Sequence, residues 1–96
     1  MAIYALVDVD VRDAAQYRTF MMQMESALEE AGARYLARAG AHTVHEGEGR
    51  PRRLALLKFP SIAAWEEFYN GPIYRGLKAI REQCSTPRLV NVDGLS

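Results

Sequence analysis

The chain has two histidines, His42 and His45, and they are its first candidates for acid–base chemistry. Imidazole has an ordinary pKa near neutrality, which makes His42 a candidate general base. Because the two histidines stand three residues apart in an expected strand, their side chains should point to opposite faces. They are therefore poorly placed to hold one metal ion together, and Glu46 adds no recognised ligand spacing. We expect neither a metal site nor a cofactor.

Arg38 is the second candidate, because an arginine inside a sheet of small and apolar residues needs an anionic or hydrogen-bonding partner. Its planar fork could capture a ligand carboxylate or enolate. In that hypothesis His42 or Asp8 moves a proton while Arg38 holds the developing oxyanion. The alternative is a structural salt bridge within the chain or across a dimer. Its candidate partners are Asp8, Asp10 and Glu46.

A third group of candidates surrounds the Gly71–Pro72 helix break, which separates Tyr69 from Tyr74. Arg81 follows Tyr74 by seven residues and so lies on the same helix face. Together with Arg38 these residues would form an apolar pocket with a few polar anchors. We predict that the substrate contacts are Tyr17, Tyr69, Tyr74 and Arg81. The alternatives are that the aromatic residues are core and that Arg81 pairs with Glu82 or Glu30.

Other catalytic patterns are missing from the sequence. Cys84 falls on the apolar stripe of an expected helix and is interpreted as a small core residue rather than a nucleophile. There is no nucleophile elbow and no phosphate-binding glycine loop. The polar segment EGEGRPRR, residues 46–53, is too short and too nearly neutral to predict a nucleic-acid site.

Composition sets the limits within which these residues act. Ninety-six residues with 49% hydrophobic and 25% charged side chains predict a single domain over 1–96. Twelve basic residues balance twelve acidic ones, so we expect neither nucleic acid nor a membrane as partner. No apolar run approaches the roughly 20 residues that span a bilayer. The segment MAIYALVDVD has no basic region typical of a signal peptide, which favours a cytoplasmic protein.

The elements that must position the candidates can be predicted from periodicity. Residues 3–11 alternate as a strand, with Ile3 and Val9 on one face. Residues 13–31 have helical spacing, with Asp13 as N-cap and Gly32 after the last turn.

Further along the chain, residues 34–44 predict a strand with a bulge at Gly40, and residues 54–59 a third strand. A helix with Ser61 as N-cap should bury one face and break at Gly71–Pro72. A new helical segment follows, and residues 88–92 predict the last strand. The expected buried positions of the two helical segments are Ile62, Trp65, Phe68, Tyr69, Ile73, Leu77, Ile80 and Cys84.

The predicted order β-α-β-β-α-β is typical of the α+β ferredoxin-like fold, with two helices on one face of a four-stranded antiparallel sheet. The expected strands carry apolar residues on both faces, such as Leu6 and Leu56 opposite Ala5 and Leu57. A monomer would leave an apolar face in water. We therefore predict a homodimer in which two sheets pack face to face, against the alternative of a monomer with a mildly apolar outer face.

Three segments resemble the small bacterial proteins grouped as domain of unknown function 1330. They are GARYLARAGAHTVHEGE, RRLALLKFPSIAAWEEFYNGPIYRGLKAIR and RLVNVDG, and they cover nearly the whole chain. The resemblance implies a dimeric α+β barrel, a fold shared with antibiotic-biosynthesis monooxygenases, muconolactone isomerases and several stress-related binding proteins. It implies no assigned activity. The family pattern is matched at Arg38, Gly40, Glu46, Gly47, Phe59, Tyr69, Tyr74 and Arg81, and departs at Phe68 and Gly71, where Trp and Ser are usual.

Two classes of function fit these observations. The first is the binding of a small aromatic, keto or lactone-like metabolite between sheet and helices, with cofactor-independent isomerase or monooxygenase-like chemistry. The second is a non-catalytic homodimeric binding or structural module. An enzyme should lose turnover in Arg38→Ala or His42→Ala while it remains folded, whereas a structural Arg38 should lose stability.

Overall fold

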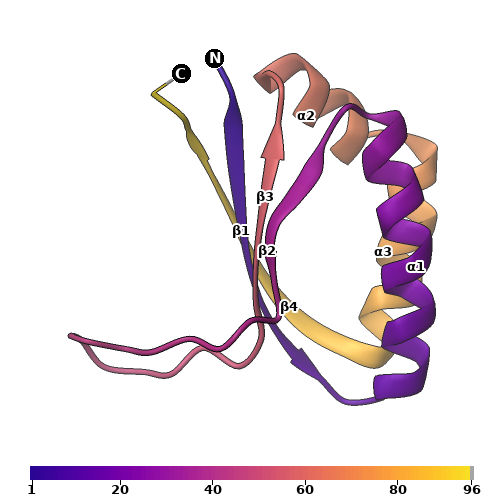
Figure 1. Cartoon of the computed structure of the whole chain (residues 1–96). Coiled ribbons are helices and arrows are strands. Elements are labelled where there is room, and N and C mark those ends of the chain that lie inside the picture. The colour runs from indigo at the N-terminus through magenta and orange to yellow at the C-terminus, as the bar shows by residue number, and fades with distance from the viewer. Residues whose placement is uncertain (96) are drawn as a thin grey trace.

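The computed structural model describes residues 1–95 and places four strands and three helices in them (Figure 1). Their bounds are β1 (Ile3–Val11), α1 (Ala14–Glu30), β2 (Arg34–Arg38), β3 (Leu54–Phe59), α2 (Ile62–Tyr69), α3 (Pro72–Cys84) and β4 (Ser85–Asp93). The strands form one antiparallel sheet in the order β2-β3-β1-β4. The helices lie on one side of this sheet (Figure 1). The predicted ferredoxin-like α+β fold is confirmed.

The start and end of α1 follow from the residues that the sequence singled out. The Asp13 side chain accepts a hydrogen bond from the Gln16 backbone N–H at 3.1 Å and so satisfies one unpaired donor of the first turn. Gly32 adopts a φ of +75°, a conformation that costs a residue with a Cβ more than it costs glycine. Both predictions for this helix are confirmed.

The core lies between α1, α3 and the covered face of the sheet. Ile3, Ala5 and Val9 of β1 are buried, as the alternation of the strand predicted. Phe59 at the end of β3 is fully buried and contacts the rings of Trp65 and Phe68. The core therefore joins the central strands to all three helices.

The prediction for the second strand was wrong in length and in the place of its bulge. β2 ends at Arg38 because Ala39 takes a left-handed φ of +56° and turns the chain away. The register shift lies between Tyr35 and Ala37 rather than at Gly40. Residues 39–53, called the arm below, leave the sheet on the side opposite the helices (Figure 1).

The predicted buried faces of α2 and α3 were wrong, because each helix turns a different face to the core. In α3 the buried residues are Tyr74, Leu77, Arg81 and Cys84, so the stripe includes Arg81 while Ile73 is 58% exposed. In α2 no residue is fully buried, and Ile62 is 48% exposed. The short α2 lies over the end of the sheet and covers it only partly (Figure 1).

The last strand is longer than predicted, because β4 begins at Ser85 and includes Pro87. Proline is tolerated there because β4 is an edge strand of the sheet.

The face of the sheet away from the helices is open and apolar in its centre. Leu6 pairs with Leu56 on β3 and with Val90 on β4, so three apolar side chains form one row. Leu6 and Val90 are nearly half exposed and Val92 is 62% exposed. The structure thus has the apolar outer face that the sequence predicted.

Candidate functional site

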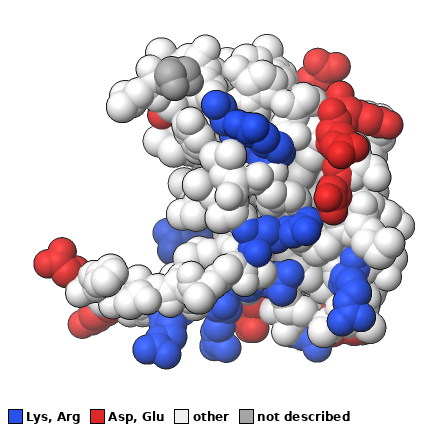
Figure 2. Space-filling view, in the orientation of Figure 1, with Lys and Arg blue, Asp and Glu red and all other residues white. Residues whose placement is uncertain are grey.

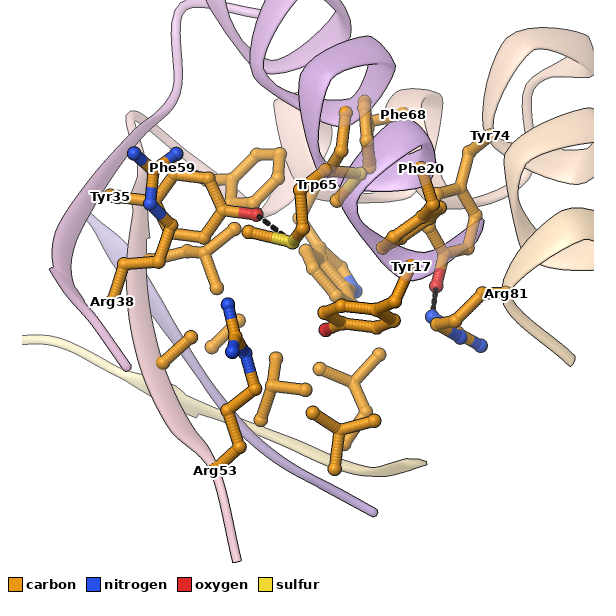
Figure 3. A pocket seen from close by; sticks show the side chains of 18 residues that line it. Tyr17, Phe20, Tyr35, Arg38, Arg53, Phe59, Trp65, Phe68, Tyr74 and Arg81 are labelled. Carbon is orange, nitrogen blue, oxygen red and sulfur yellow. Dashed lines mark hydrogen bonds between the residues drawn. The ribbon is translucent and has the colours of Figure 1, made fainter. Parts of the chain in front are cut away.

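A cavity lies between the covered face of the sheet and the helices (Figure 3). The volume within it that is open to the centre of a water-sized sphere is about 40 Å³. Side chains therefore fill most of this space, and a ligand larger than a few water molecules has to displace some of them. Most of the lining is apolar or aromatic. Its ionisable lining residues are three tyrosines and three arginines, namely Tyr17, Tyr35, Tyr74, Arg38, Arg53 and Arg81.

Arg81 is a buried cation at one end of this cavity (Figure 3). Its exposed fraction is 8%, and one terminal nitrogen donates a hydrogen bond to the hydroxyl of Tyr74. Its Nε is buried and has no hydrogen-bond partner among residues 1–95. The structure shows no pairing with Glu82 or Glu30, so that alternative was wrong. A buried guanidinium without a carboxylate is costly unless something compensates it.

The helix break between α2 and α3 positions Tyr74 for this contact. A side chain on Gly71 would come within 2.8 Å of the Glu67 carbonyl oxygen, so glycine permits the tight turn. The rings of Phe68 and Tyr69 lie 5.1 and 5.2 Å from that of Tyr74. These contacts fix the Tyr74 ring, and Arg81 meets its hydroxyl two helical turns later.

Arg38 lies at the opposite side of the cavity from Arg81 (Figure 3). It forms an ion pair with Glu25 of α1 at 3.2 Å, and its guanidinium carbon is 5.1 Å from the centre of the Tyr35 ring. The predicted partners were wrong because Arg38 pairs with Ala55 in the sheet and points to the helix side. Both side chains of the ion pair are about half exposed, which keeps its contribution to stability small.

The Arg38–Glu25 ion pair lies at the opening of the cavity. A second, more open hollow between α1 and the start of the arm is lined by both residues. It shares Tyr17, Met21, Arg38 and Arg53 with the inner cavity. The two hollows therefore adjoin at these four residues.

Sequence reasoning missed Arg53. It was assigned to the polar segment before β3, yet its guanidinium carbon lies 5.2 Å from the centre of the Tyr17 ring, over the cavity. Alternation could have found it, because Arg53 has the same parity as the inward-facing Ala55 and Leu57. Tyr35, also missed as a site residue, is inward-facing by its pairing with Leu57.

Two tyrosines of the cavity, Tyr17 and Tyr35, favour their neutral forms. Burial raises the pKa of Tyr35 to about 12. Burial also raises the pKa of Tyr17, although the charges of Arg53 and Arg81 oppose the shift. The Tyr35 hydroxyl makes only a weak contact, at 3.7 Å, with the sulfur of Met21. At neutral pH these phenols are hydrogen-bond donors rather than bases.

The raised pKa of Tyr35 predicts a loss of stability at alkaline pH. An unfolded tyrosine loses its proton near pH 10 and the folded Tyr35 near 12, so between these values the folded state holds more protons. The free energy of unfolding should therefore fall as pH rises through this window, by up to about 3 kcal/mol. Urea unfolding at pH 9, 10 and 11 should show a flatter profile for Tyr35→Phe. Equal slopes for the two proteins would contradict the assignment.

Three of the seven predicted site residues lie outside the cavity. Asp8 is on the open face of the sheet, where its side chain accepts a hydrogen bond from the Arg52 backbone N–H at 2.9 Å. His42 is in the arm, with its Nε2 2.9 Å from the Pro51 carbonyl oxygen. Tyr69 is 36% exposed and stacks on Trp65. The single chain therefore does not bring His42 or Asp8 to Arg38.

Acidic and basic side chains gather in different regions of the molecular surface. Figure 2 shows acidic side chains gathered over the helices and basic ones where the arm leaves the sheet, on the face in view. No group of three or more potential metal-ligating side chains occurs in residues 1–95. Within the same residues, none of the helices has the length and apolar character needed to cross a bilayer.

The comparisons with known proteins agree on the fold. The model of the family described as domain of unknown function (DUF1330) matches residues 2–95. No curated protein matches the sequence. A protein of unknown function from Rhodopseudomonas palustris has a similar structure, with a TM-score of 0.79, 20% identity, and coverage of 99% of this chain and 83% of that one.

Two further solved structures are similar at lower identity. A mutant of SnoaB, a cofactor-independent oxygenase from Streptomyces nogalater, matches with a TM-score of 0.72 and 9% identity, over 99% of this chain and 94% of that one. A dimeric ferredoxin-like protein of unknown function from Jannaschia matches with a TM-score of 0.69 and 14% identity, over 98% and 100%. At these identities the likeness shows a shared fold alone.

Proposed function

The chain belongs to the DUF1330 family, and from this premise we propose that it binds a small aromatic or keto metabolite as an anion in the cavity between sheet and helices. The proposal rests on the buried and unpaired position of Arg81. Its guanidinium is buried at the cavity, and in residues 1–95 it has no carboxylate partner. A carboxylate, enolate or phenolate of the ligand would supply the missing charge and accept a hydrogen bond from the guanidinium.

The rest of the lining suits the body of such a ligand. Phe20, Trp65 and Phe68 provide aromatic surface on which a flat molecule can stack. Tyr17 and Tyr35, neutral at physiological pH, provide hydroxyl donors for its oxygen atoms. Anionic, aromatic and hydrogen-bond-accepting character are the three properties that this lining selects.

Cofactor-independent isomerase or monooxygenase-like chemistry is the second candidate. Arginines in a water-poor cavity stabilise negative charge that develops on an enolate, and three of them line this one. Yet the cavity lining includes no carboxylate or imidazole that could remove a proton from a neutral substrate. We therefore put binding of a preformed anion first, and non-catalytic binding is its simplest form.

The ligand class can be tested by thermal unfolding of the wild-type protein with aromatic carboxylic acids, keto acids and hydroxyquinones, and with uncharged amides and lactones of the same shape. We expect anions to raise the melting temperature and neutral analogues to have no effect. A ligand at 100 times its dissociation constant adds about 2.7 kcal/mol. Arg81→Gln should abolish the shift, whereas Arg50→Gln, in the exposed arm, should keep it. A shift that survives in Arg81→Gln would refute the proposal, and loss of absorbance of a bound compound would favour catalysis.

We also propose that the protein is a homodimer in which the open sheet faces pack together. This is supported by the apolar row of Leu6, Leu56 and Val90 and by the similarity to proteins described as dimeric. Two such faces would form an interface on the order of 1,600 Å² in total. The arm projects on the same side as this face, where it would meet a second copy (Figure 1).

A charge in the centre of the open face should therefore separate the protomers. Leu6→Glu would bury a carboxylate in the proposed interface, opposite either the same carboxylate of the second copy or an apolar side chain. The free-energy cost of burying this charge favours the monomer. Light scattering coupled to gel filtration should show about half the wild-type mass. Ile73→Glu, a similarly exposed position on the helix side, is the matched control and should remain dimeric. A dimeric Leu6→Glu would place the interface elsewhere.

A further inference from the structure

The arginines of the cavity outnumber the carboxylates near them. Arg38 is paired with Glu25, and this is the single ion pair within residues 1–95. Arg53 and Arg81 line the same cavity without a carboxylate partner in that part of the chain. We infer that the ligand is a two-ended dianion, with one acidic group bound by Arg81 and the other by Arg53. This inference rests on the proposed function and specifies its ligand.

The Arg81 end of the site is deep and rigid. The side chain is 92% buried, as its exposed fraction of 8% implies, and its hydrogen bond to Tyr74 fixes the guanidinium. The Nε has no hydrogen-bond partner among residues 1–95 and is enclosed by neighbouring side chains, so an acceptor reaches it only when they move. Because the surrounding residues exclude water, a single carboxylate gains a strong charge-assisted bond here.

The Arg53 end lies nearer the opening. The carbonyl oxygen of Arg53 accepts a hydrogen bond from the Val9 N–H at 3.0 Å, which fixes the backbone from which the side chain extends over the cavity. The guanidinium lies over the ring of Tyr17 and also interacts with its hydroxyl, and it has no carboxylate partner within residues 1–95. Arg38 is close by on the same rim of both hollows, but its charge is already balanced by Glu25.

Tyr17 separates the two cations. Figure 3 shows its ring between Arg53 and Arg81, and the charges of both act on its hydroxyl. A ligand that lies along this ring would present its two ends to different arginines. Acidic groups at opposite ends of an aromatic ring fit this arrangement better than groups on adjacent carbons, because the ring of Tyr17 keeps the two cations apart. The site should therefore discriminate by the separation of the two charges as well as by their number.

Isothermal titration of four probes tests the inference: benzoate, phthalate with adjacent carboxylates, terephthalate with opposite ones, and the neutral terephthalamide. We expect terephthalate to bind at least tenfold more tightly than benzoate or phthalate, and terephthalamide not to bind. Arg53→Gln should reduce terephthalate to the affinity of benzoate and leave benzoate unchanged. Arg81→Gln should weaken both acids, and Arg50→Gln neither.

The outcomes distinguish a failure of the two-ended ligand from a failure of the proposed function. If benzoate binds through Arg81 but terephthalate gains nothing, or if Arg53→Gln affects both acids equally, the two-ended ligand is refuted while the proposed function stands. If no acid binds the wild-type protein, both are refuted. Circular dichroism of each variant establishes that it is folded, and Arg81→Lys, which keeps the charge, should restore part of the benzoate affinity.

Discussion

Replacing Arg81 by methionine and Tyr74 by phenylalanine together should stabilise the ligand-free protein by about 1–4 kcal/mol and abolish its response to aromatic carboxylates. Arg81 is a buried charge without a carboxylate partner in residues 1–95, and its desolvation opposes folding. Methionine has a similar length and adapts to irregular core space. Phenylalanine removes the Tyr74 hydroxyl that the missing guanidinium would otherwise leave unpaired.

The single variants show which part of the effect comes from the charge. Arg81→Met alone leaves the hydroxyl of Tyr74, whose residue is 2% exposed, without its hydrogen bond, at a cost of about 1–3 kcal/mol. It should therefore be less stable than the double variant. Urea unfolding measures each protein at one fixed protomer concentration, because dimerisation would otherwise shift the midpoint. A double variant that is destabilised by 3–5 kcal/mol would mean that Arg81 is held by a carboxylate in the assembled protein.

A residue that costs stability and lines a cavity is best explained by what it binds. A buried guanidinium could be replaced by an apolar side chain at little structural cost. Its presence in the lining of the cavity, with only 8% of the residue exposed, is the kind of local inconsistency that marks a functional site. The half-exposed Arg38–Glu25 pair lacks this property, because solvent and its partner already satisfy it.

The fold could be predicted because its local signals agree with one another. Asp13 caps α1, Gly32 follows its end, and β1 alternates between a buried and an open face. The prediction failed where a single backbone angle decides the path. Ala39 adopts a left-handed conformation that alanine seldom takes, and this ends β2 and sends His42 into the arm.

The candidate site could be predicted only in part, for the same reason. The seven-residue spacing of Tyr74 and Arg81 is a property of one helix, and the structure places them in contact. The partner of Arg38 could not be found from sequence, because Glu25 reaches it only when α1 packs over β2. Arg53 was hidden by its polar neighbours, although it precedes β3 with the same parity as the inward-facing Ala55 and Leu57.

Phe59→Ala should be the most destabilising substitution in this protein, with an expected loss of about 3–5 kcal/mol. The side chain is fully buried at the end of β3, with its ring 5.0 Å from that of Trp65 and 5.3 Å from that of Phe68. These two ring contacts join the sheet to α2, so the cavity left by alanine would lie beneath that helix. Since a domain of this size has only about 5–15 kcal/mol of stability, the variant should be close to unfolding.

The matched control for Phe59→Ala is Ile62→Ala, which removes a large apolar side chain from the first turn of α2. Ile62 is 48% exposed, and a substitution at such a surface position should change stability by at most about 0.5 kcal/mol. Urea unfolding of the two variants compares them directly. Similar losses would mean that α2 is held by its outer face and not by Phe59. A large loss confined to Phe59→Ala, with hydrogen exchange faster in α2 than in α1, would show that this one ring fixes α2 over the cavity and so keeps Tyr74 in place for Arg81.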